Sequence, residues 1–194
     1  MLIAPIREHV LQTCQREQNI LGPSFFPEHV VVVANCGVQL AASLDADAEI
    51  VELAAYLHDL SAICDPSTFP IHAQASATLA RDLLNERGYP PHIVSSVADA
   101  IASHSAPLQV GSASPEAVCL SNADAVARIL RPAYWLYFAF RVRGLGFVEG
   151  RDWLRSLLES QWCALIEPAK ELVGAQYSAT IDLLRTGTAS VNAV

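Results

Sequence analysis

The sequence has few charged side chains, few aromatic ones and little basic character. Of its 194 residues, 16% are charged and 7% are aromatic, whereas 52% are hydrophobic. So much aliphatic surface can form a buried core, which excludes disordered and fibrous proteins. Twelve basic against twenty acidic side chains give a net charge of -8. We expect no binding to duplex nucleic acid, because contacts from basic residues to phosphates supply most of that affinity.

The sequence also lacks a disulfide pattern and a long apolar run. Its five cysteines are scattered and odd in number, without a CxxC pair, which is typical of reduced thiols in the cytosol. The start, MLIAPIREHV, carries Arg7 and Glu8 where a secretory signal needs an unbroken apolar region. No apolar run reaches the roughly 18 residues of a membrane-spanning helix. We therefore expect a cytoplasmic protein with no membrane partner.

Apolar residues recur at helical spacing along most of the chain, and no segment sustains the alternation of a half-buried strand. Breaks that contain Pro, Gly or Asp divide the pattern into about eight helices. The valines at 30–33 continue into a 3.6-residue period, so we predict a helix there. Asp47 and Ser114 are predicted N-caps, and Pro168 and Gly174 should divide or kink the last span. The predicted spans are 5–19, 26–44, 47–62, 71–88, 91–104, 115–130, 132–145 and 150–185.

These spans predict one all-α domain over residues 1–186, with a C-terminal helical layer over about 132–186. The last residues, 187–194, have no periodic apolar face and are expected to form a disordered tail. Residues 134–140 hold five of the fourteen aromatic side chains. We expect this aromatic segment to pack in the core of the C-terminal layer or to form a homodimer contact, and it is less well suited to bind a nucleobase.

Four of the six histidines fall on the predicted apolar faces of successive helices, where a neutral imidazole needs a hydrogen-bond or metal partner. Asp59, directly after one of them, and Asp124 are carboxylates in similarly apolar surroundings. A buried carboxylate beside a buried imidazole is costly, and a divalent metal that takes both as ligands removes the cost. His9 and His92 lie near predicted helix starts and are interpreted as ordinary surface or capping-region residues. The four histidines are His29, His58, His72 and His104.

The ordered set of His29, the dyad His58 and Asp59, and Asp124 resembles the H...HD...D signature of the HD superfamily of metal-dependent phosphohydrolases. The segments PEHVVVVANCGVQLA, ELAAYLHDLSA, HAQASATLARDLL, VADAIASHS and LSNADAVARI resemble the helices of small stand-alone HD proteins, over about residues 26–130. The resemblance implies an HD-domain helical bundle that binds a divalent metal through these four residues. Two imidazoles and two carboxylates suit Mn, Fe, Co, Ni or Zn, and bind Mg less selectively.

His72 and His104 occupy positions that, in several HD branches, hold a second metal or contact the phosphate. Three roles stay open for them: ligands of a second metal, phosphate contact or acid for the leaving group, and structural core histidines. The branch with a full two-metal site has a further histidine after the position of His104. Here Ser105 stands instead, which weakens the two-metal interpretation.

The chain departs from many relatives in a second way, because it reads HDLSA where they carry a lysine near the phosphate. Its only lysine is Lys170, so an arginine must supply any positive side chain. Arg128 is the first candidate, because it lies four residues after Asp124 on the same helical face. The weaker candidates are Arg81, Arg131, Arg141 and Arg143.

The resemblance implies hydrolysis of a phosphomonoester or phosphoanhydride in a nucleotide or similar small phosphorylated substrate. Water on the metal would lose several pKa units and attack phosphorus as hydroxide. Asp59 would also orient that water, while His72 or His104 steers the phosphate or protonates the leaving oxygen. A cyclic nucleotide phosphodiesterase would use the same chemistry. Two further alternatives are a metal-containing ligand-binding or sensing module without turnover, which the missing lysine leaves open, and a purely structural helical bundle.

Overall fold

The computed structural model describes residues 3–185, and in that part of the chain every regular element is a helix. The predicted all-α fold is therefore confirmed. The predicted tail, 187–194, lies outside the described residues. The α-helices are α1 (Ile3–Cys14), α2 (Val31–Leu44), α3 (Ala48–Leu57), α4 (Leu60–Cys64), α5 (His72–Glu86), α6 (Pro91–Ser103), α7 (Pro115–Leu130), α8 (Pro132–Tyr137), α9 (Phe147–Ala164) and α10 (Glu167–Arg185). Short π-helical turns span Phe26–Val30 and Phe138–Val142, and a 3-10 helix spans Pro66–Ile71.

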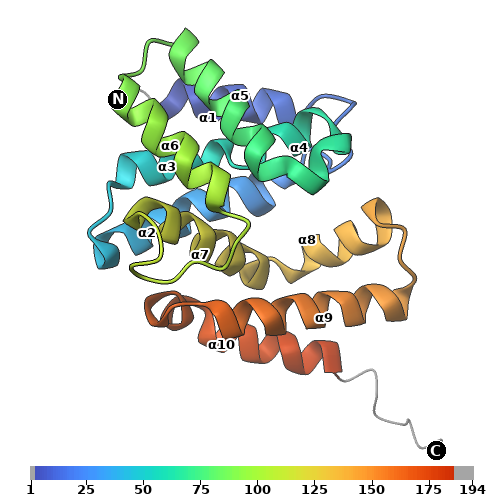
Figure 1. The fold of residues 1–194 in the computed structure, drawn as a ribbon. Coiled ribbons are helices and arrows are strands. Elements are labelled where there is room, and N and C mark those ends of the chain that lie inside the picture. Colours follow the sequence, from blue (N-terminus) through green and yellow to red (C-terminus); the bar gives the residue numbers. More distant parts are fainter. Residues whose placement is uncertain (1–2, 186–194) are drawn as a thin grey trace, which may run out of the picture.

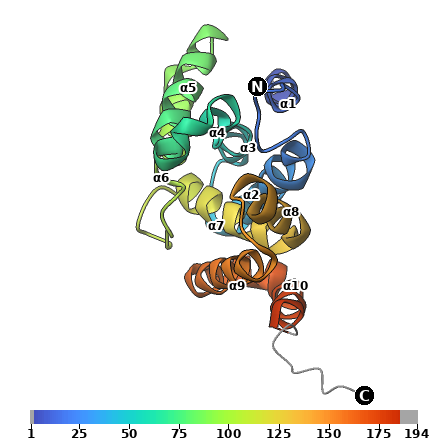
Figure 2. The ribbon, with the colours of Figure 1, turned by 90° about the vertical axis from the view of Figure 1, so that its right-hand side faces the viewer.

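The helices stack in layers along the molecule (Figure 1). Helices α2, α3 and α7 pack on one another at the centre, and the pair α5 and α6 covers one side of them. Helices α9 and α10 lie side by side beneath α7 and α8, which Figure 2 shows from the second direction. The C-terminal layer therefore covers the helix that carries Asp124.

The prediction of one continuous helix over 47–62 is wrong, because the structure has two helices there, α3 and α4, with a break between them. Asp59 has φ -112° and ψ 14°, outside the α-helical range. In a continuous helix, consecutive side chains point about 100° apart. The break explains how His58 and Asp59 can face the same place although they are neighbours in sequence.

Other boundaries also differ from prediction. The first helix ends at Cys14 rather than at 19, and the last span divides at residues 165–166. Pro168 lies instead in the first turn of α10, where a proline is tolerated, and Gly174 lies inside that helix. The valine segment is helical as predicted, after a π-helical turn that holds His29.

Two predicted helix caps are confirmed. The Asp47 carboxylate accepts hydrogen bonds from the backbone N–H groups at the start of α3, and the Ser114 hydroxyl accepts one at the start of α7. Such caps satisfy donors that have no partner inside the helix. They fix the starts of the two helices that lead to His58 and Asp124.

All five cysteines lie in the described part of the chain and are free thiols. Cys14, Cys36 and Cys119 are buried, as expected for small apolar side chains, but Cys64 and Cys163 are exposed. Among the helices between residues 3 and 185, none combines the length and apolarity needed to cross a lipid bilayer.

Gly37 allows α2 to pack closely on α3. A Cβ atom there would lie 2.8 Å from Cγ1 of Val51. We expect Gly37→Ala to lower the free energy of unfolding by about 1 kcal/mol, because overpacking costs about 1–3 kcal/mol and better helix propensity returns about 1 kcal/mol. Thermal or urea unfolding of the parent and the variant measures this difference.

Gly174 provides the matched control within α10. A Cβ there would lie 3.7 Å from the Trp162 ring, an ordinary contact. Gly174→Ala should therefore raise the free energy of unfolding by about 0.5–1 kcal/mol. An equal gain in stability from both substitutions would contradict the close approach of α2 and α3.

Candidate metal centre

The structure brings the four predicted ligands together from three separate segments. Nε2 of His29 lies 3.2 Å from Nε2 of His58 and 3.3 Å from Oδ1 of Asp124. Oδ2 of Asp59 lies 3.1 Å from Nε2 of His58 and 3.6 Å from Nε2 of His29. All four side chains are buried. These residues are 95 positions apart at the extremes of the sequence, so the fold alone creates their common centre.

Asp59 joins this centre to a second group. Its other oxygen, Oδ1, lies 3.6 Å from Nε2 of His72 and 3.9 Å from Nε2 of His104. One ligand atom from each of Asp59, His72 and His104 lies within 4.8 Å of the others. The structure thus places both additional predicted histidines beside the dyad, with one carboxylate between the two groups.

Three of the histidines are oriented by the backbone. The Nδ1 atoms of His58, His72 and His104 each lie 2.7–2.9 Å from the carbonyl oxygen of the residue three positions earlier. A carbonyl only accepts hydrogen bonds, so Nδ1 carries the proton and donates it. In the neutral imidazole the lone pair is then on Nε2, which faces Asp59. This arrangement is the one found around metal-binding histidines, whose second nitrogen is fixed by a hydrogen bond.

His29 is held by aromatic packing instead. Its ring stacks on Phe25, with centroids 4.8 Å apart, and the ring of Trp135 lies at 88° to it, with centroids 5.2 Å apart. Its Nδ1 is buried without a hydrogen-bond partner among the described residues. The predicted aromatic segment therefore packs inward at Trp135, where it supports a candidate ligand.

The unpaired atoms of the centre fit a divalent cation. Oδ1 of Asp124 and Nε2 of His104 are buried without a hydrogen-bond partner within residues 3–185. Ligand atoms that lie about 2.0–2.2 Å from one ion are about 3–3.6 Å from their neighbours, which matches the shorter separations around His29 and His58. The buried group of His29, His58 and Asp59 is able to hold a metal ion, and its mixed imidazole and carboxylate donors suit first-row divalent metals.

The electrostatics of the centre also favour a positive ion. Burial alone would raise the pKa values of Asp59 and Asp124, but the nearby histidines lower the pKa of Asp59 below its usual range, and Arg128 together with the histidines does the same for Asp124. Burial likewise lowers the pKa of His58, yet the two carboxylates outweigh it and raise that pKa to about 9. For His104, burial and the neighbouring His58 lower the pKa to about 4. Two ionised carboxylates thus share a buried space that attracts a proton or a cation.

Arg128 lies beside this centre, as its spacing predicts. Its Nη1 is 2.6 Å from Oδ2 of Asp124, and its guanidinium group lies over the ring of Trp135, 5.1 Å from the centroid. The weaker arginine candidates lie elsewhere: Arg81 pairs with Asp99, Arg131 pairs with Glu28, Arg143 covers Trp153, and Arg141 is exposed. His9 is half-buried and His92 is exposed, and neither belongs to the two groups of candidate metal ligands.

Ser105, which replaces the additional histidine of the two-metal branch, contacts His72. Its Oγ lies 3.2 Å from Nε2 of His72. Because Nδ1 of His72 is the donor to a carbonyl, Nε2 accepts this bond from the hydroxyl. The lone pair of His72 therefore already has a partner, whereas the lone pair of His104 has none.

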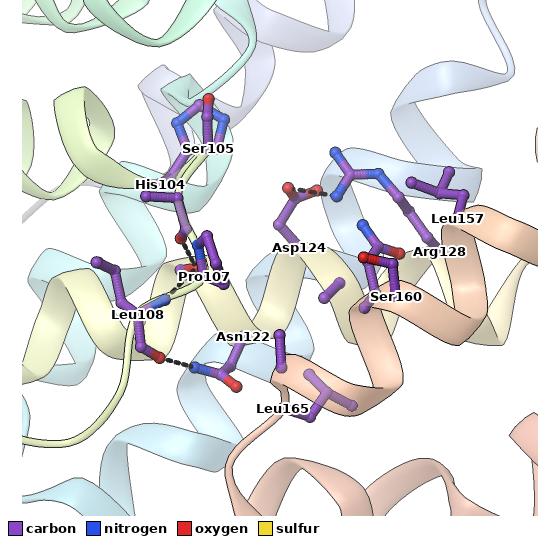
Figure 3. A pocket seen from close by; sticks show the side chains of 15 residues that line it. His104, Ser105, Pro107, Leu108, Asn122, Asp124, Arg128, Leu157, Ser160 and Leu165 are labelled. Carbon is purple, nitrogen blue, oxygen red and sulfur yellow. Dashed lines mark hydrogen bonds and ion pairs between the residues drawn. The ribbon is translucent and has the colours of Figure 1, made fainter.

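A cavity of about 260 Å³ opens beside the centre. His104, Asp124 and Arg128 line one part of it, and Leu157 and Ser160 of α9 line the part beside Arg128 (Figure 3). Gln161 of α9 also lines the cavity. Nothing in the sequence marked these α9 residues, because they belong to no motif and their position depends on how α9 packs against α7.

Comparisons with known proteins identify the family and the fold of the chain. The family model described as "HD domain" matches residues 27–129. A crystal structure of a predicted HD superfamily hydrolase from an uncultured Thermotogales bacterium is similar, with a TM-score of 0.64 and 22% sequence identity. That match covers 95% of this chain and 90% of the other chain. No curated protein matches the sequence.

Proposed function

Because this chain belongs to the HD domain family, we propose that it is a metal-dependent phosphohydrolase. The proposed reaction is hydrolysis of a phosphomonoester or phosphoanhydride in a nucleotide or similar small phosphorylated substrate. One observation carries the proposal: four buried side chains, His29, His58, Asp59 and Asp124, converge on one centre beside a cavity. Arg128 at the edge of that cavity adds the positive charge that a phosphoryl group needs.

A divalent cation in the four-residue centre, with Mn, Fe, Co, Ni or Zn preferred to Mg, supplies Lewis-acid chemistry that activates water and neutralises phosphoryl charge. The residues of the chain position the reactants. Oδ1 of Asp59 accepts a hydrogen bond from the attacking water, and Arg128 binds a phosphoryl oxygen. Once protonated at Nε2, in place of the hydrogen bond from Ser105, His72 would give this proton to the leaving oxygen, because its side chain is 26% exposed whereas that of His104 is fully buried.

We place the tightly bound metal in the four-residue centre and treat Asp59, His72 and His104 as a weaker second group. The hydrogen bond from Ser105 to His72 supports this order, since a second ion would have to displace it. His104 then acts as a phosphate contact or as the ligand that completes a second site. Metal analysis at increasing Mn²⁺ concentration tests the order, because one equivalent should bind well before a second.

The proposed activity is tested by phosphate or pyrophosphate release from nucleoside mono-, di- and triphosphates, cyclic nucleotides and cyclic dinucleotides, with Mn²⁺ or Co²⁺ added. Turnover of a monoester or anhydride supports the proposal, whereas turnover of cyclic substrates alone indicates a phosphodiesterase. Binding of a phosphorylated ligand without turnover would indicate the sensing module that the missing lysine leaves open. Protein without stoichiometric metal and without turnover would indicate a structural bundle.

Arg128→Ala is expected to lower kcat/KM about 100-fold, because one charged donor to the phosphoryl group is lost. Arg128→Lys should recover part of this loss, since a lysine keeps the charge but not the forked geometry. Steady-state kinetics with the best substrate of the panel measure both variants. Arg81→Ala is the control, because Arg81 lies on the surface and pairs with Asp99. Unchanged kcat/KM in Arg128→Ala would contradict the proposed phosphate contact.

The proposal also includes partners and location. We propose that the protein acts in the cytoplasm, where its five thiols stay reduced. Tyr137 and Phe147 keep large exposed fractions, and we propose that they form the homodimer contact expected near the aromatic segment. Sedimentation of the parent and of Phe147→Ser compares their oligomeric states.

A further inference from the structure

We propose that Gln161 of α9 is a specificity-determining residue, whose amide oxygen accepts a hydrogen bond from the organic part of the substrate. The inference rests on the proposed function and narrows its substrate class. It assigns a substrate about the size of one nucleoside monophosphate or smaller, with a hydroxyl or amino group that reaches α9.

The first observation is that Gln161 and the metal centre line the same cavity. Asp124 and Arg128 line it from α7, and Gln161 lines it from α9 together with Leu157 and Ser160. Figure 3 shows Leu157 and Ser160 beside Arg128, which forms the ion pair with Asp124. A molecule with its phosphoryl group at Arg128 therefore has its organic part against α9.

The second observation is the state of the Gln161 side chain. Its Oε1 atom is buried and has no hydrogen-bond partner among residues 3–185. A buried acceptor without a partner is costly, and native proteins leave few of them. An amide oxygen accepts hydrogen bonds and cannot donate them. The matching group on a ligand must therefore be an N–H or O–H donor.

This requirement identifies which part of the substrate Gln161 contacts. The oxygens of an ionised phosphate are acceptors, so they cannot satisfy the amide oxygen at neutral pH. A hydroxyl or amino group on the organic part can do so. A substrate without such a donor leaves the buried oxygen unpaired, which is the situation in which proteins discriminate most strongly between similar molecules.

Hydrogen bonds hold the segment that follows Gln161 against the helix of the metal centre. Asn122, two residues before Asp124 in α7, accepts a bond from the backbone N–H of Ile166 through Oδ1, at 3.0 Å. The side chain of Gln109 donates to the carbonyl of Ala164 at the end of α9. These bonds tie the C-terminal end of α9 to α7 and to the loop after α6. The wall that carries Gln161 is thus pre-organised, although it lies outside the family match at residues 27–129.

The volume of the cavity sets the size of the substrate. At about 260 Å³, it lies just below the range of about 300–1,000 Å³ for pockets that hold drug-sized ligands. One small phosphorylated molecule fits this volume better than a dinucleotide. The cavity therefore favours a monomeric substrate whose organic part spans from Arg128 to Gln161.

The proposal is tested by binding of phosphonate probes to the Mn²⁺-loaded protein. A P–C bond replaces the scissile P–O bond in these probes, so turnover does not disturb the measurement. Phenylphosphonate has no donor on its organic part, whereas the 5′-phosphonate analogues of the four common ribonucleosides have several. Isothermal titration calorimetry gives each Kd. We expect the parent to bind at least one nucleoside phosphonate about 10-fold more tightly than phenylphosphonate, because only that probe satisfies Gln161.

Gln161→Leu should abolish this 10-fold preference and change the Kd of phenylphosphonate less than about 2-fold. The variant is expected to fold, since replacing an unpaired buried amide by an apolar side chain of similar size removes a cost. Gln161→Glu keeps an acceptor and should retain the preference for the nucleoside phosphonate, even if its charge weakens the binding of both probes. Gln176→Leu, in α10, is the matched control and should behave like the parent.

Two results would overturn the proposal: a parent that binds no nucleoside phosphonate more tightly than phenylphosphonate, or a Gln161→Leu variant that keeps the parent preference. Neither depends on turnover, because the ratio of two Kd values is measured with probes that are not cleaved. Failure of the proposed phosphohydrolase activity would appear separately, as the absence of phosphate release from every substrate of the panel. The two failures are therefore distinguishable.

Discussion

Asp59→Ala is expected to remove both the bound metal and the catalytic activity. The Asp59 carboxylate lies between the two groups, with Oδ2 3.1 Å from Nε2 of His58 and Oδ1 3.6 Å from Nε2 of His72. Without it, the centre loses one of its two anionic ligands and the acceptor for the attacking water. We expect the metal content to fall from about one equivalent to less than about 0.1, and phosphate release to fall at least about 10³-fold.

Metal analysis by mass spectrometry and phosphate-release assays on the same preparation measure both quantities. Asp99→Ala is the control, because the Asp99 side chain is 73% exposed on α6 and pairs with Arg81. It should keep the metal and the activity of the parent. Loss of turnover with full metal content would assign Asp59 to catalysis alone, and full retention of both would contradict its place in the centre. Turnover that the parent has and Asp59→Ala lacks would also exclude the sensing module.

The candidate centre could be predicted from the sequence because each of its polar residues interrupts an apolar pattern. His58 continues the buried face of the helix that ends at Leu57, and Asp124 lies within a helix whose apolar face is clear. A polar side chain in such a position needs a partner, whatever the fold. The order of His29, the dyad and Asp124 along the chain then supplied the family resemblance.

The local geometry of the dyad could not be predicted in the same way. Helical periodicity runs through residues 47–62 without a Pro or Gly, so nothing in the pattern marks the break at Asp59. That break depends on tertiary contacts, including the hydrogen bond from the backbone N–H of Ser61 to the hydroxyl of Ser76 in α5. The role of α9 was equally hidden, since Gln161 reaches the cavity through the packing of a separate layer on α7.

The protein without metal is expected to be most stable near pH 6.5. The pKa of His58 rises from 6.5 to about 9 in the folded state, mainly because the carboxylates of Asp59 and Asp124 outweigh the effect of burial. The stabilisation by its proton is therefore complete below about pH 6.5 and is lost as the pH rises through about 9. Burial lowers the pKa of His104 to about 4, so its contribution is present above about pH 6.5 and is lost as the pH falls through about 4.

Each of these pKa shifts contributes up to about 3 kcal/mol to the free energy of unfolding. This corresponds to a change in Tm of about 6–12 °C for a chain of this size. Differential scanning calorimetry of chelator-treated protein between pH 4 and pH 10 measures the profile. His92→Ala is the control, because His92 is exposed on α6 and away from the centre. A Tm that stays constant from pH 6.5 to pH 9 would show that the two carboxylates do not act on His58.

Added Mn²⁺ should change the shape of this profile as well as its height. A cation in the centre occupies the place of the His58 proton, so the bound protein no longer depends on that proton for stability. At about 1,000 times the Kd, the metal stabilises the folded state by about 4 kcal/mol, which raises the Tm by about 8–16 °C. Protons compete with the metal for the imidazole nitrogens, so this rise should grow between pH 6.5 and pH 9. Asp59→Ala should show no rise at any pH, because the ion and the proton depend on the same carboxylate.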